Sequence, residues 1–123
     1  MTDERFLELL EGPLNHPLLP FCLTRISLAL VMVANSCGRE GADALEAYCE
    51  TSRPECRDAD GRMSNDRINE LLNGPLRGSD LLATLEKTSK ALRYVVDTCG
   101  KRGDLALESY CEERDARDRA PEE

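Results

Sequence analysis

The sequence predicts an all-α protein, a helical bundle built from two tandem copies of a three-helix unit. Apolar residues recur at intervals of three and four, the spacing that one face of a helix requires. Runs in which apolar and polar residues alternate, as they do in strands, are missing. The chain also repeats itself after 62 residues, and 23 identities in 50 aligned positions are far above chance. These observations indicate helices arranged in two equivalent sets.

The repeat aligns residues 1–50 with residues 63–112 without a gap. A unit of about 60 residues is only marginally stable alone, so we expect the two copies to share one core. Because closed two-fold dimers are the commonest oligomers, we expect a pseudo-two-fold axis to relate the copies, as if a small homodimer had been fused. The predicted organisation is one helical domain over residues 1–112 with a linker at 51–62, followed by a charged C-terminal tail at 113–123.

The first helix of each copy is predicted at 3–11 and 65–73, where apolar residues stand at i, i+3 and i+4. A Gly-Pro pair follows each of these helices and ends it, because proline cannot continue a helix. The third helix of each copy is predicted at 42–52 and 104–114, after a Cys-Gly pair. Its inner stripe consists of the leucine, tyrosine and cysteine that both copies share.

The second helix is the longest and is predicted at 17–37 and 79–99. Ser79 is a good N-cap for the second copy. In the first copy Pro17 suits the first helical turn, and Pro20 is still close enough to the start to be tolerated. An apolar stripe along each helix should face the shared core.

The two copies of this second helix differ in polarity. Where the second copy has Asp80, Lys90 and Arg93, the first has Leu18, Leu28 and Val31. One interpretation is that the first-copy helix is the central helix of the monomer and is buried on more than one face. The other is that its extra apolar stripe forms an interface with a partner. The candidate partner-binding residues are Leu18, Cys22, Arg25, Leu28, Val31 and Met32.

Six cysteines are the other candidate functional groups. Four form a duplicated pair, namely Cys37, Cys49, Cys99 and Cys111. Each lies on an apolar stripe, where a free cysteine packs as a small hydrophobic residue. Disulfides between the copies and a four-cysteine metal site are the alternatives, although no Cys-x-x-Cys spacing is present. Cys56 lies between Arg53 and Arg57, which favour a thiolate, so it is either a reactive thiol or an incidental exposed one.

Composition narrows the class of partner. The formal net charge is −8, from 24 acidic and 16 basic residues, which argues against nucleic acid because phosphate binding needs a basic face. The most apolar stretch, 18–34, is interrupted by Pro20 and Arg25, so no membrane-spanning helix is expected. The N-terminus lacks the pattern of a secretory signal. We therefore expect a cytoplasmic protein with reduced thiols.

No arrangement typical of an enzyme is visible. The chain has a single histidine and no glycine-rich phosphate loop, so we predict neither catalysis nor a cofactor. The leading hypothesis is a small acidic protein-interaction module of the adaptor, chaperone, inhibitor or immunity type. Its partner would be another protein, preferably a basic one, or a second copy of itself. The alternative hypothesis is a redox or metal sensor that uses the cysteines.

Overall fold

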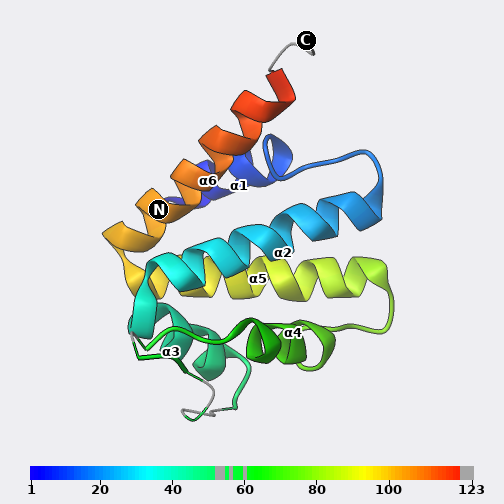
Figure 1. The fold of residues 1–123 in the computed structure, drawn as a ribbon. Coiled ribbons are helices and arrows are strands. Elements are labelled where there is room, and N and C mark those ends of the chain that lie inside the picture. Colours follow the sequence, from blue (N-terminus) through cyan, green and yellow to red (C-terminus); the bar gives the residue numbers. More distant parts are fainter. Residues whose placement is uncertain (52–54, 56, 60, 120–123) are drawn as a thin grey trace.

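Six helices and no strand make up the described part of the chain, residues 1–51, 55, 57–59 and 61–119 of a computed structural model (Figure 1). The helices are α1 (Asp3–Glu11), α2 (Leu19–Ser36), α3 (Gly38–Tyr48), α4 (Asn65–Asn73), α5 (Leu81–Cys99) and α6 (Lys101–Arg119). The prediction of an all-α helical bundle is confirmed for these residues.

Local capping explains why α1 and α4 have the bounds that the sequence predicts. The hydroxyl of Thr2 accepts a hydrogen bond from the backbone N–H of Arg5 at 3.1 Å. The hydroxyl of Ser64 accepts one from Arg67 at 3.2 Å in the same way. Each bond satisfies one of the backbone donors that a helix start leaves unpaired. The start of each helix therefore depends on a side chain that directly precedes that helix.

The long helices α2 and α5 begin two residues later than predicted. The N-cap of α5 is Asp80 rather than Ser79, and its carboxylate accepts a hydrogen bond from Ala83 N–H at 2.8 Å. A carboxylate at this position also interacts favourably with the positive end of the helix dipole. In α2, Pro20 lies in the first turn, where its missing N–H leaves no helical bond unmade.

The helices α3 and α6 begin earlier than predicted, and their ends also differ from the prediction. Gly38 and Gly100 both have φ of +61°, so the chain turns at a single residue and the next helix starts at once. α3 ends at Tyr48, because Glu50 takes a left-handed conformation with φ of +56° and Thr51 N–H then bonds back to the carbonyl of Glu46. α6 instead continues to Arg119 through residues that favour helix, and its last turns extend beyond the bundle (Figure 1).

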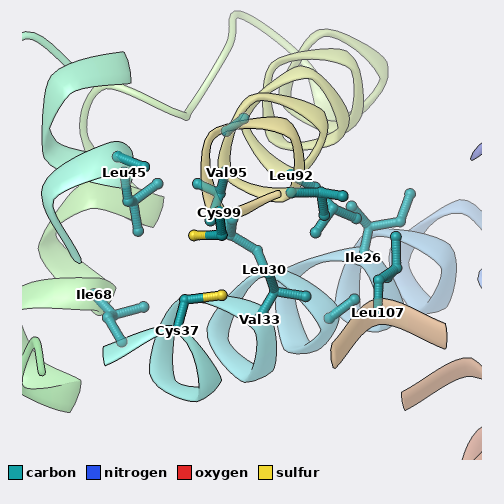
Figure 2. Close-up of a cluster of buried hydrophobic side chains, with 14 of the residues drawn as sticks. Ile26, Leu30, Val33, Cys37, Leu45, Ile68, Leu92, Val95, Cys99 and Leu107 are labelled. Carbon is teal, nitrogen blue, oxygen red and sulfur yellow. The ribbon is translucent and has the colours of Figure 1, made fainter. Parts of the chain in front are cut away.

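The core is centred on α2 and α5, which lie side by side and run in the same direction (Figure 1). Their facing side chains come from equivalent positions of the two copies (Figure 2). Leu30 and Val33 of α2 and Leu92 and Val95 of α5 all belong to this core cluster, and all four side chains are fully buried (Figure 2). α3 and α6 contact both central helices, so these helices are covered on several sides.

The first helix of each copy packs on the other copy. α1 lies along α6, where Arg5 Nε donates a hydrogen bond to Glu108 Oε1 at 2.8 Å (Figure 1). α4 lies along α3, where Arg67 donates to Glu46 Oε2 at 3.4 Å. Arg5 and Arg67 are equivalent residues, and so are Glu46 and Glu108. The same ion pair thus joins the copies in both directions.

Candidate protein-binding face

α2 is apolar on two sides, and one of them is exposed. Its inner side, with Ile26, Leu30 and Val33, is buried in the core. On its outer side the exposed fractions are 56% for Leu18, 55% for Phe21, 50% for Leu28 and 42% for Met32. With Arg25, these residues follow alternating steps of three and four, the spacing at which one helix packs on another. We call Leu18, Phe21, Arg25, Leu28 and Met32 the α2 face.

Most of the predicted partner-binding residues belong to this face. Val31 is half-buried and lies at the edge of the α2 face. The prediction is wrong for Cys22, which is 7% exposed and whose thiol donates a hydrogen bond to the carbonyl of Leu14 at 3.5 Å. Helical spacing places residue 22 one position further around the helix than residues 18 and 25, toward the core.

Sequence comparison missed two exposed apolar residues. Phe21 corresponds to Ala83, so no change from polar to apolar marked it. Leu105 of α6 is 61% exposed and replaces Asp43 of the first copy. A comparison of the third helices would have found Leu105, because it is the same kind of exchange as Leu18 for Asp80.

The one charged residue of the α2 face is turned toward the neighbouring loop. Nη1 of Arg25 donates hydrogen bonds to the carbonyls of Pro13, at 3.3 Å, and Asn15, at 2.5 Å. Its charge is therefore held beside backbone oxygens, while its methylene groups remain in line with Phe21 and Leu28. The face keeps an apolar character along its length despite the arginine.

A groove runs beside α2, and Leu28 and Met32 are the residues of the α2 face that line it. Three adjoining hollows of about 670, 220 and 370 Å³ form it. Leu28 lines the first and second hollows, and Met32 lines the second and third. The first hollow has its far wall on α4 and the start of α5, and the other two have theirs on α6, including Tyr110. A groove between helices that is lined by leucine and methionine is a common binding site for an amphipathic helix.

The structure brings two of the predicted thiols together and leaves others apart. Cys37 and Cys99 lie next to each other at the ends of α2 and α5, and both are buried (Figure 2). Burial and this contact raise the pKa of Cys99 to about 12. Cys111 is buried on α6, and Cys49, after the end of α3, is half-buried with its pKa raised by burial to about 11. Cys56 lies outside the described residues.

Two further properties bear on the predicted partners and cofactors. Within the described ranges, no group of three or more His, Cys, Asp or Glu residues is placed to hold a metal ion. α2 is long and apolar enough to span a membrane by length and composition, although a core helix of a soluble bundle has the same character. The expectations of no membrane and a cytoplasmic location stay predictions.

Comparisons with known proteins find no matching family model, no matching curated protein and no matching solved structure.

Proposed function

We propose that this protein binds an amphipathic helix of another protein along the α2 face. The observation that carries the proposal is the exposed heptad stripe, whose four apolar side chains are 42–56% exposed. Apolar surface of this extent on one helix marks an interaction site more often than it reflects chance. Binding, rather than catalysis, is the activity that such a surface supports.

The shape of the surface favours a helix as the ligand. The α2 face presents side chains at steps of three and four, and these match the anchor positions i, i+3 and i+7 of an amphipathic helix. The groove beside it continues from Leu23 to Ser36, which is about 20 Å of helix. A ligand helix of about 14 residues or more would fill that length.

Charge favours a basic partner over a second copy of this chain. The protein carries a net charge of −8, so two copies repel each other at long range, whereas a basic partner is attracted. Arg25 repels a basic partner only weakly, because its guanidinium donates hydrogen bonds to the carbonyls of Pro13 and Asn15. α2 itself contains no acidic residue, so the contact is apolar at its centre and the attraction comes from the surrounding surface.

We also propose that a pseudo-two-fold axis runs along the α2–α5 pair and relates the two three-helix units. The reciprocal ion pairs, Arg5 with Glu108 and Arg67 with Glu46, support this arrangement. So does the meeting of equivalent side chains between two parallel helices, such as Leu30 with Leu92. We expect a rotation of about 180° to superpose one unit on the other. On this proposal the α2 face corresponds to a face of α5 that is polar, and the two faces differ because α2 has apolar residues at the equivalent positions.

Two synthetic helices test the proposed ligand. Both have leucine at heptad positions a and d over 18 residues, and one has lysine and the other glutamate at the remaining positions. We expect the lysine peptide to bind more tightly in a fluorescence-anisotropy titration, with an affinity that falls as salt is added. Leu28→Lys should weaken its binding about tenfold or more, because a half-exposed leucine is lost from the contact and a like charge is introduced.

Leu7→Lys is the matched control, because Leu7 is 53% exposed on α1 and lines no part of the α2 groove. Its binding and its helical circular dichroism should equal those of the unmodified protein. Equal binding of the two peptides would contradict the choice of a basic partner. A dimer that Leu28→Lys converts to a monomer, as measured by light scattering, would identify a second copy as the occupant instead.

A further inference from the structure

Cys37 and Cys99 stand at equivalent positions and end the two central helices. Cys37 caps α2 and Cys99 is the last residue of α5. Because α2 and α5 run in the same direction, equivalent residues meet along the pair, from Leu30 with Leu92 to Cys37 with Cys99 (Figure 2). Figure 2 shows the two sulfurs facing the same space between the helix ends.

The two thiols are in contact with each other and are shielded from solvent. Their exposed fractions are 1% for Cys37 and 7% for Cys99, and the two sulfurs face each other in Figure 2. Sulfurs that are already neighbours need to approach each other only to about 2 Å to form a covalent bond. Cys22, by contrast, donates to the Leu14 carbonyl.

We propose that Cys37 and Cys99 form a reversible disulfide that joins the C-terminal ends of α2 and α5 and thereby links the two halves of the molecule. The oxidant is a small-molecule disulfide. The thiolate of one cysteine attacks a sulfur of that disulfide, forms a mixed disulfide and releases one thiol. The second cysteine then attacks the protein sulfur of the mixed disulfide and releases the second thiol. Two protein thiols are oxidised and one small disulfide is reduced to two thiols.

The surroundings make this reaction slow and selective. Burial of both sulfurs limits access, and burial raises the pKa of Cys99 to about 12, so little thiolate is present near neutral pH. The first attack therefore requires a transient opening of the helix ends. Once the first sulfur is captured, the second lies beside it, and closure is intramolecular. Oxidation should accordingly yield this pair rather than a mixture of partly oxidised forms.

The full-length protein, incubated with oxidised glutathione at pH 8 and digested with trypsin, tests the proposal directly. Cleavage after arginine and lysine places Cys37 in peptide 26–39 and Cys99 in peptide 94–101, each as the only cysteine. Mass spectrometry should detect these two peptides joined by a disulfide, and dithiothreitol should separate them. Oxidation should leave the mass of the protein in solution unchanged, and the urea unfolding midpoint should rise by about 1 M or more, because the bond closes a long loop.

Cys49→Ser is the control, since Cys49 is half-buried at a different site and its loss should change neither result. Cys99→Ala should lose both the linked peptide and the shift in midpoint. The peptide measurement on the unmodified protein needs no variant, so poor folding of Cys99→Ala does not obscure the outcome. Failure of peptides 26–39 and 94–101 to link under oxidation, or preferential linkage of other cysteines, would overturn the proposal.

Discussion

At the scale of single residues, burial determines how much an ion pair contributes to the stability of the protein. Arg67–Glu46 and Arg5–Glu108 are the same ion pair at equivalent positions, yet the side chains of Arg67 and Glu46 are 5% and 3% exposed whereas those of Arg5 and Glu108 are 44% and 37% exposed. The buried carboxylate of Glu46 also pairs with Arg57. Removal of a buried partner leaves unpaired charge in the core, while an exposed partner is replaced by water.

We therefore expect Glu46→Ala to lower the free energy of unfolding by about 3 kcal/mol, because Arg67 and Arg57 lose their buried carboxylate and keep only the exposed Glu70 and Asp43. Glu108→Ala, at the equivalent position, should leave the urea midpoint nearly unchanged. Urea titrations of the two variants, followed by circular dichroism, make this comparison. Equal losses in the two variants would show that burial does not set the strength of this pair.

The buried thiols lead to a prediction about alkaline pH. Burial raises the pKa of Cys99 to about 12 and that of Cys49 to about 11, above the value of about 8.5 expected in an unfolded chain. Between these values the folded state holds protons that the unfolded state has lost, so stability falls as pH rises. We expect reduced protein to have a constant urea midpoint from pH 6 to 8 and a falling one above about pH 9. Cys99→Ala should fall less steeply over the same range.

At the scale of elements, the junction between α2 and α3 depends on how closely the two helices approach. A Cβ at Gly41 would lie 2.2 Å from the carbonyl oxygen of Ala34, which is backbone and cannot move aside. Gly103 stands in the same relation to Val96, at 2.5 Å. Gly38 differs. Its φ of +61° is a left-handed conformation that favours glycine, but a Cβ there would meet no other atom within 4 Å. Glycine thus serves two purposes within one short segment.

Gly41→Ala should destabilise the protein by about 3 kcal/mol or more, although alanine is the better helix former, because the helices must separate to admit the methyl group. Gly38→Ala should cost only about 1–2 kcal/mol, the price of a left-handed backbone conformation for alanine. The midpoints of thermal unfolding distinguish the two variants. A smaller loss for Gly41→Ala than for Gly38→Ala would contradict the close approach.

Elements whose ends depend on local chemistry were predictable, and those that depend on packing were not. The bounds of α1 and α4 follow from a capping hydroxyl and a Gly-Pro pair, both visible in the sequence. The starts of α3 and α6 were predicted several residues late, because single glycines at positive φ reverse the chain without a loop. The difference between copies identified Leu18 and Leu28, which are exposed, but also Cys22, which is core. Helical spacing alone gives only an approximate angle around an axis.

At the scale of the whole molecule, the repeat predicted two equivalent sets of helices but not which set each helix packs against. The equivalence of Arg5 and Arg67 is visible in the sequence, whereas their pairing with Glu108 and Glu46 of the opposite copy is not. Either copy could bury the same residues against its own third helix. The choice is made by the long central helices, which separate each first helix from its own third helix, and such distances appear only in three dimensions (Figure 1).

Of the six described helices, α1 is synthesised first, yet the helix that it packs against, α6, is synthesised last. Arg5 and Glu108 are separated by 103 positions in the chain, and contacts over such separations slow folding relative to local ones. α4, in contrast, can pack on α3 as soon as it is made. We therefore expect α3 and α4 to associate before α1 docks, because α1 can pack on α6 only when α6 has been made (Figure 1).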